Sequence, residues 1–219
     1  MTKFISMLIL VFICSGNLWA QITGTFKDKR DGQIYKTIEI GDQLWMAENL
    51  RYRVNNVVEE NVAIQEEVGF DFAQGYPESD KYKPEFGLYY TWKEANVACP
   101  AGWKLPSKTD WEKLFEEVGG KEIAGARLAS RSEIWKEPFD PKIEACGFNI
   151  EPTGYRFYIL YRLWEVGKRS FYWSSTELHE QSAIGFDFHA GYSEVFGGQL
   201  GYRKENATSV RCIKSTKEN

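Results

Sequence analysis

Histidine and cysteine, the side chains that most often bind metals in short motifs, are scarce here, with 2 and 4 among 219 residues. No Cys-x-x-Cys pair occurs, and His179 does not begin a zinc motif because Ala183 stands where the second histidine would be. Lys27 and Lys29 likewise occupy positions that an EF-hand loop before Gly32 would need for acidic ligands. Short motifs therefore predict no metal ligand set and no cofactor.

An excess of positive charge is also missing. The chain has 27 lysines and arginines against 31 aspartates and glutamates, a net charge of −4. Binding to nucleic acid or to an anionic membrane surface requires a basic excess or a basic face. We therefore expect no nucleic-acid partner.

Long hydrophobic runs are absent too. A membrane-spanning helix needs about 20 apolar residues, and the longest run, residues 7–14, is too short. It lies between a lysine and the small residue Ala20, which is the arrangement of a secretory signal peptide over residues 1–20. We expect cleavage near Ala20, no transmembrane segment, and a secreted, periplasmic or cell-surface location. Lipid attachment at Cys14 is disfavoured because the bulky Phe12 and Ile13 precede it.

Aromatic residues, in contrast, are abundant at 16% of the chain, and 43% of all residues are hydrophobic. This is enough for the core of a single domain over residues 21–219. Acidic side chains dominate residues 53–86, which predicts an acidic, loop-rich insertion in that domain. The aromatic density fits either a core built on rings or a surface that stacks on sugars, and composition leaves both open.

The clearest local structure is a helix that begins after Ser107. Ser107 is a good N-cap, and Asp110 three residues later can complete a capping box. Trp111 starts an apolar stripe at helical spacing, and Gly119 follows where the stripe ends. We interpret both Trp111 and Trp103 as core residues.

Strand signals occupy the first and last thirds of the chain. Glycine turns and alternating residues predict three strands over 23–50, with Ile34, Ile38 and Ile40 on one face. A second short helix is expected from Thr91, and residues 123–129 fit either a helical turn or a strand. Strands before and after two short helices indicate an α+β fold with a mainly antiparallel twisted sheet and long loops. The further strands are expected at 87–92, 148–151, 155–161, 171–174, 183–188, 193–196 and 209–214.

Three cysteines follow the signal segment, and outside the cytoplasm a pair of them should oxidise. Cys99 and Cys212 each border a predicted element, and a bond between them would fasten the C-terminal strand to the helical region. We therefore predict a Cys99–Cys212 disulfide. Cys146 is interpreted as a small buried hydrophobic residue, with a reactive or intermolecular thiol as the alternative.

Six blocks of the sequence, in order, resemble the Fibrobacter succinogenes major paralogous domain family of exported bacterial proteins. The resemblance covers nearly all of the chain after the signal segment and implies the C-type lectin-like fold with which the family is grouped. It implies a fold and an exported setting, because the family has no defined biochemical role. The blocks are residues 31–50, 87–90, 99–106, 147–149 with 154–156, 172–177 and 210–213.

Enzymatic interpretations are weaker. Residues 105–112 also resemble the formylglycine-generating enzymes, which share that general fold and depend on a reactive cysteine pair. Here Cys99 is expected to pair with Cys212, which leaves Cys146 without a partner. A nucleophile elbow at Gly191 fails because Val195 replaces its second glycine. We expect no enzyme, and an activity related to the formylglycine-generating fold is the remote alternative.

Calcium binding in the C-type lectin manner is a further alternative. Glu151, Pro152 and Thr153 are similar to the Glu-Pro-Asn motif that binds calcium and sugar in that fold, but the asparagine is missing. No Trp-Asn-Asp segment follows. The expectation therefore stays at no cofactor.

The remaining functional signal is a segment rich in rings and basic side chains. Because a strand buries alternate residues, about half of the rings between 155 and 173 should face outward. We expect an exported, non-catalytic recognition domain that binds a glycan or a surface protein, or, as the alternative, a structural subunit of a surface assembly. The binding candidates are Tyr161, Trp164, Arg156, Arg162 and Glu177.

Overall fold

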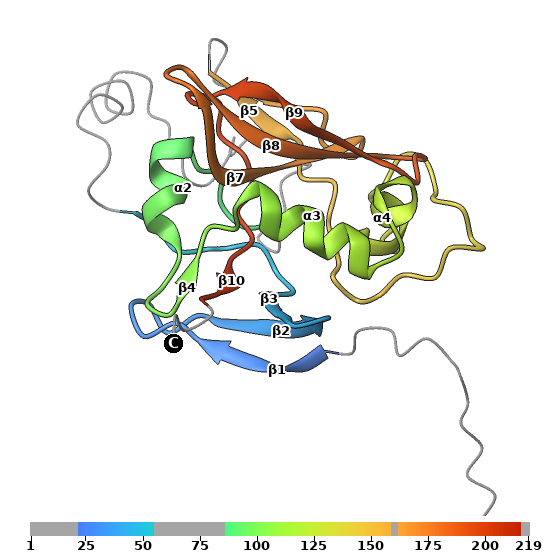
Figure 1. Ribbon diagram of the computed structural model, residues 1–219, viewed down its shortest axis with the longest axis horizontal. Coiled ribbons are helices and arrows are strands. Elements are labelled where there is room, and N and C mark those ends of the chain that lie inside the picture. The colour runs from blue at the N-terminus through green and yellow to red at the C-terminus, as the bar shows by residue number, and fades with distance from the viewer. Residues whose placement is uncertain (1–21, 55–85, 159–161, 216–219) are drawn as a thin grey trace, which may run out of the picture.

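A computed structural model describes residues 22–54, 86–158 and 162–215 of the chain (Figure 1). The predicted signal peptide, residues 55–85 of the acidic insertion, and Tyr161 lie outside the described residues. The described part has three sheets and three short helices, which confirms the α+β class and the antiparallel strand pairing. The expectation of two helices is wrong by one, because the stretch after Gly120 is helical.

The N-terminal strands form a five-stranded antiparallel sheet with the end of the chain. The three strands predicted over 23–50 are confirmed, with tight turns at Gly32 (φ 79°) and Gly41 (φ 59°). Ile38 and Ile40 are buried, but Ile34, the first residue of β2, is 56% exposed. The order is β1 (Ile22–Lys27), β2 (Ile34–Ile40), β3 (Gln43–Met46), β10 (Ile213–Lys214), β4 (Trp103–Lys104).

The helices are α2 (Trp92–Ala98), α3 (Lys108–Glu117) and α4 (Lys121–Leu128). Both predicted N-caps are confirmed: Thr91 caps α2 and Ser107 caps α3, each in a reciprocal capping box. After α3 the chain passes through Gly119 and Gly120, both near φ 102°, which a side chain would resist. These glycines end α3 and turn the chain into α4.

The second half of the chain builds a three-stranded antiparallel sheet of β7 (Arg169–His179), β8 (Ser182–His189) and β9 (Val195–Arg203). Beside it lies the two-stranded sheet of β5 (Tyr155–Phe157) and β6 (Arg162–Trp164). The strands expected at 87–92 and 148–151 are wrong. These segments are largely buried but make only isolated bridges, Tyr90 with Thr208 and Ala129 with Ile150, because their other hydrogen bonds go to separate loops.

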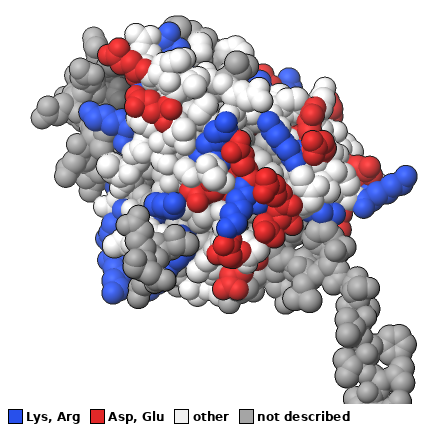
Figure 2. All heavy atoms as spheres, viewed as in Figure 1, with Lys and Arg blue, Asp and Glu red and all other residues white. Residues whose placement is uncertain are grey.

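Helix α3 lies between the two larger sheets and supplies the centre of the core (Figure 1). The Trp111 ring is fully buried, 4.9 Å from the Trp45 ring on β3 and 5.8 Å from Phe186 on β8. Trp103 is also buried, at 6% exposure, so both tryptophans are core residues as predicted. The face of the molecule in Figure 2 carries intermixed charges of both signs. Exposed ion pairs of the protein include Lys113–Asp42 and Lys108–Glu112.

A buried cation joins the segments of the core. Arg211 is 1% exposed, and its guanidinium donates to Asn49 Oδ1 (2.8 and 3.1 Å) and to the carbonyl oxygens of Phe148 (2.5 Å) and Asn149 (3.2 Å). It also lies 4.6 Å from the Phe148 ring centroid. Burial lowers the pKa of Arg211. Tyr172 on β7 donates to the same Asn49 oxygen at 2.8 Å, so this oxygen links the cation to the second sheet.

The Cys99–Cys212 disulfide is confirmed, with Cα atoms 5.9 Å apart and a sequence separation of 113. It fastens the residue after Arg211 to the end of α2. Cys146 is free and buried at 3% exposure, and burial raises the pKa of its thiol. Its interpretation as a small hydrophobic core residue is therefore confirmed. No helix in the described ranges is long and apolar enough to cross a membrane.

Replacing Asn49 should destabilise the fold strongly. Asn49→Ala removes the oxygen that accepts hydrogen bonds from Arg211 and Tyr172, leaving a buried charged donor without it. We expect the free energy of unfolding to fall by about 2–4 kcal/mol, measured by urea denaturation. The control Asn96→Ala, on the exposed face of α2, should change it by less than about 0.5 kcal/mol. Similar small effects of both substitutions would contradict this role for Asn49.

The α3 capping box predicts a pH dependence. Burial acts to raise the pKa of Asp110, but hydrogen bonds from the Ser107 backbone and side chain, with Lys104 nearby, outweigh it and lower that pKa. A carboxyl with a lowered folded pKa stabilises the protein above its unfolded pKa, and this contribution disappears as the pH falls through the folded pKa.

Asp110→Asn should therefore lower the free energy of unfolding by about 1 kcal/mol at pH 6, and the difference from the parent should shrink towards pH 2. Urea denaturation at a series of pH values measures it. Glu116→Gln, an exposed change later in α3, should show no such trend. A deficit of Asp110→Asn that stayed constant with pH would refute the capping account.

Candidate functional site

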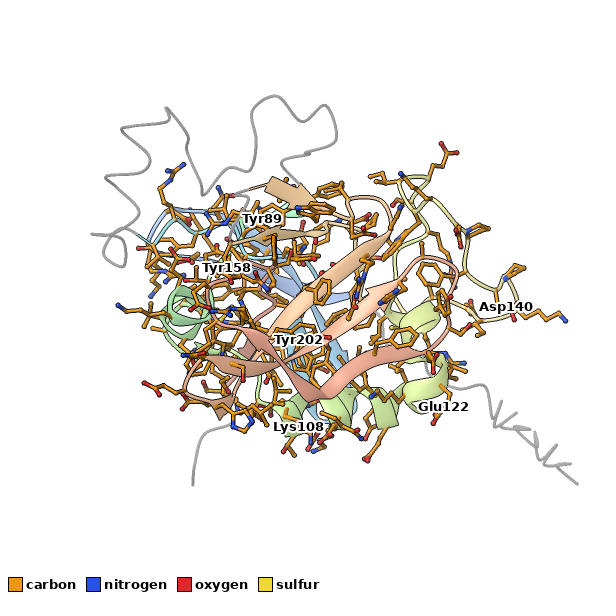
Figure 3. All side chains as sticks on the ribbon, turned by 90° about the horizontal axis from the view of Figure 1, so that it is seen from above. Tyr89, Lys108, Glu122, Asp140, Tyr158 and Tyr202 are labelled. Atoms are coloured by element: carbon orange, nitrogen blue, oxygen red, sulfur yellow. A yellow bond between two sulfur atoms is a disulfide. The ribbon has the colours of Figure 1, made fainter. Side chains whose placement is uncertain are left out.

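The three-stranded sheet has two different faces because side chains alternate along each strand. Tyr172, Phe186 and Phe188 point into the core around Trp111. The residues that alternate with these along β7 and β8 lie on the opposite face, where Tyr202 on β9 contacts Phe171. They are Arg169, Phe171, Gly185, Asp187 and His189. Figure 3 looks down on the molecule from this side, with Tyr202 labelled over the strands.

A cavity of about 200 Å³ opens on this opposite face. It lies between the sheet, the first residue of β5, and the segment after β9. We call it the Tyr202 cavity. Its lining residues are Tyr155, Arg169, Phe171, Tyr172, Trp173, Gly185, Tyr202, Asn206 and Thr208.

Aromatic rings form much of the wall. The Phe171 ring lies 4.8 Å from the Tyr155 ring and 5.1 Å from the Tyr202 ring, both in edge-on geometry. Gly185 leaves space beside Tyr202, since a Cβ there would stand 3.1 Å from the Tyr202 ring and 3.0 Å from the Tyr172 carbonyl oxygen. A glycine at this strand position therefore lets the Tyr202 ring lie close against β8.

One edge of the cavity is held by a buried carboxylate. Asp187 is 1% exposed and accepts hydrogen bonds from Arg169 through Nη2 and Nε, while His189 Nε2 lies 2.6 Å from its Oδ2. The Arg169 guanidinium also lies 4.8 Å from the Phe171 ring centroid. Partial burial acts to lower the pKa of Arg169, but the hydrogen bond and charge of Asp187 outweigh it and raise that pKa. Arg169 is thus charged and fixed at the cavity wall.

The hydroxyls of the cavity stay protonated. Burial raises the pKa of Tyr202 to about 12 and also raises the pKa of Tyr155. On the other wall, Asn206 Oδ1 accepts from the Tyr158 backbone N–H at 3.2 Å. The amide NH2 of Asn206 therefore remains as the donor that this side chain can offer to a ligand.

None of the sequence-predicted candidates that the structure describes lines this cavity. Trp164 is 42% exposed and pairs with Tyr155 across β5 and β6, so the two side chains share a face. Arg156 is 8% exposed. Glu177 is exposed at the far end of β7, where it pairs with Lys204. Arg162 is on β6, but its side chain, like Tyr161, lies outside the described structure.

The residues of the calcium alternative are engaged in other contacts. Glu151 accepts a hydrogen bond from the Ser132 hydroxyl at 2.7 Å. Thr153 is buried, and its hydroxyl contacts those of Ser170 and Ser209 at 3.0 and 2.9 Å. Within the described ranges, no group of three or more His, Cys, Asp or Glu side chains is placed to hold a metal.

Sequence reasoning counted Arg169 among the basic side chains between 155 and 173 but did not select it, and it missed Asp187, Asn206 and Tyr202. A usable signal existed in β8, where Asp187 stands between the core residues Phe186 and Phe188 and so must face away from them. A carboxylate placed this way in an otherwise apolar strand needs a cationic partner. Which cation it meets depends on the pairing of β7 with β8, which the sequence does not specify.

Removing the Asp187 charge should destabilise the protein at the wall of the Tyr202 cavity. Asp187→Asn leaves Arg169 and His189 without the carboxylate that joins them, and because both are partly exposed we expect a loss of about 1–3 kcal/mol in the free energy of unfolding. Thermal or urea denaturation measures it. Asp42→Asn, which breaks the exposed pair with Lys113, should leave the denaturation midpoint nearly unchanged. Equal effects would show that Asp187 is not a structural centre of the site.

Comparison with known proteins gives one match. No curated protein and no solved structure matches the chain. The family model described as Fibrobacter succinogenes major domain matches residues 38–214, which include every block quoted above except the beginning of the first. The match spans most of the chain and includes strands of all three sheets, beginning near the end of β2. The chain therefore belongs to the Fibrobacter succinogenes major domain family.

Proposed function

We propose that this chain is an exported, non-catalytic recognition domain that binds a glycan in the Tyr202 cavity. The export follows from the signal-like residues 1–20. The architecture proposed is the C-type lectin-like fold that the family resemblance implies. The binding surface differs from the one expected in sequence, because its centre is Tyr155, Phe171 and Tyr202.

The observation that carries the proposal is the composition of the cavity wall. Small-molecule sites are concave and mostly apolar, with a few polar groups that fix orientation. The Tyr202 cavity has three neighbouring rings, with Arg169, Asn206 and two tyrosine hydroxyls as polar groups. The C–H faces of a sugar can pack on such rings while its hydroxyls bond to the polar groups.

The same wall supports a binding role over catalysis. Within the part of the chain that the structure describes, the nine lining residues include no carboxylate, imidazole or thiol, which are common general acids, bases and nucleophiles. Asp187 is nearby, but it is buried and bonded to Arg169 and His189. Its place therefore suits the positioning of Arg169 better than proton transfer to a substrate.

Trp164 extends the proposed surface. It shares a face with Tyr155 across β5 and β6 and is 42% exposed, so its ring can contact a sugar next to the one in the cavity. The proposal thus predicts that oligosaccharides bind more tightly than single sugars.

The test is binding of the exported chain to a broad glycan array, followed by calorimetry with a positive oligosaccharide. Tyr202→Ala removes a cavity ring and should weaken binding by tenfold or more, roughly 1.4 kcal/mol. Trp164→Ala should weaken binding of the oligosaccharide but not of the single sugar. The control is Tyr192→Ala, a tyrosine 53% exposed outside the cavity, which should bind as the parent does.

Two outcomes would contradict the proposal. One is an array without a single positive glycan, together with surface proteins that co-purify with the chain, which would favour the structural-subunit alternative. The other is glycan binding that Tyr202→Ala leaves unchanged in a folded protein, which would place the site elsewhere.

A further inference from the structure

The geometry points to an acidic sugar, a uronic acid residue with a free carboxylate, as the ligand of the Tyr202 cavity. This inference rests on the proposed function and specifies its ligand class. It follows from three features of the cavity wall: the donors of Arg169 that remain unused, the charge of Arg169 with its Asp187 partner buried, and the contact of Arg169 with the aromatic rings.

Arg169 has hydrogen-bond donors to spare. A guanidinium carries five N–H groups in a fixed fork. Arg169 uses Nη2 and Nε on Asp187, and among the described residues none accepts a hydrogen bond from its Nη1. Because Asp187 and the Phe171 ring fix the fork, binding a ligand at the free N–H groups costs little side-chain entropy.

The rest of the polar wall adds donors to those of Arg169. Asn206 offers its NH2 group because its oxygen accepts from the Tyr158 backbone. The Tyr155 and Tyr202 hydroxyls can each donate or accept. Thr208 directs its own hydroxyl to the Ser209 carbonyl at 3.3 Å, so it offers a ligand only its oxygen. The wall can therefore bind the acceptor oxygens of a carboxylate at Arg169 and Asn206 together with the hydroxyls of a sugar.

The charge of the wall agrees with this. Arg169 is the only charged residue among the nine described residues that line the cavity. Asp187, the carboxylate that holds Arg169, is 1% exposed and is bonded to Arg169 and to His189. A ligand in the cavity thus meets the guanidinium directly and the carboxylate only through it. An anionic acceptor at Nη1 gains a charge-assisted hydrogen bond, which is about twice as strong as a neutral one.

The rings select a carboxylate carried on a sugar. Phe171 contacts Arg169 and also the Tyr155 and Tyr202 rings, so the cation and the apolar rings are adjacent. A pyranose with a carboxylate on its ring presents C–H faces and an anion at a similarly short separation. A small inorganic anion could bond to Arg169 but would leave the three rings without contacts.

The test compares free acids with their esters. The probes are trisaccharides of galacturonic, glucuronic and mannuronic acid and the methyl ester of each, titrated calorimetrically into the exported chain. The ester keeps the ring and removes the charge. We expect at least one free acid to bind tenfold or more tightly than its ester, and added salt to reduce that difference.

Matched variants distinguish a direct contact between Arg169 and the carboxylate of the sugar from an effect of the protein's net charge. The pair Arg169→Gln with Asp187→Asn removes both charges without leaving a buried carboxylate, and it should bind the acid no better than the ester. If that pair fails to fold, Asn206→Ser and Arg169→Lys each remove part of the donor set and should narrow the difference severalfold. Arg203→Gln changes the net charge at a residue paired with Glu205 outside the cavity and should keep the preference.

The outcomes are distinguishable. Equal binding of acid and ester by the parent chain overturns the acidic-sugar inference and leaves glycan binding intact. Binding of neutral glycans alone does the same. Failure of every saccharide, neutral or acidic, overturns the proposed function together with the inference. A folded double variant, Arg169→Gln with Asp187→Asn, that keeps the preference for the acid over the ester is the remaining outcome. That result would show that Arg169 does not bind the carboxylate of the sugar.

Discussion

The fold depends on a positive charge held in its interior. Arg211 is fully buried among neutral oxygens, and a buried cation is costly unless its donors are satisfied. Asn49 and the loop after Gly147 provide those oxygens, and Tyr172 shares the Asn49 acceptor. Because these groups come from four distant segments, the first sheet, the loop, β7 and the C-terminal segment must assemble together. The Cys99–Cys212 disulfide then fixes that segment next to the cation.

This arrangement leaves one face of β7 available for a ligand. Tyr172 is held on the core side by Asn49 and the rings around Trp111. The alternation of the strand then places Arg169 and Phe171 on the opposite face, on a rigid sheet. Rigid strands keep binding groups in place better than loops do. The Tyr202 cavity therefore lies on the same strand that packs against the core. Five of the family's blocks each contribute one residue to the Arg211 network or to the disulfide next to it: Asn49, Cys99, Phe148, Tyr172 and Arg211.

Local rules predicted what depends on neighbouring residues. The caps at Thr91 and Ser107 and the core role of Trp111 follow from spacing alone, and the family resemblance predicted the assignment of the chain. Features built from distant segments could not be predicted. The Arg211 network joins residues more than 160 positions apart, and the cavity depends on the pairing of β7, β8 and β9. The sequence pattern also predicted more strands than the structure has. The buried segment 148–151, for example, is irregular, and its carbonyl oxygens accept hydrogen bonds from Arg211.

The central claim is that the face of the sheet opposite the core is the recognition surface. The most direct measurement is a map of amide chemical-shift changes in isotopically labelled protein as a uronic acid trisaccharide is added. The account predicts changes concentrated at Gly185, Tyr202 and Asn206, spreading to Trp164 with the longer saccharide. Changes concentrated around Glu177 and Lys204, with the cavity amides unmoved, would contradict it.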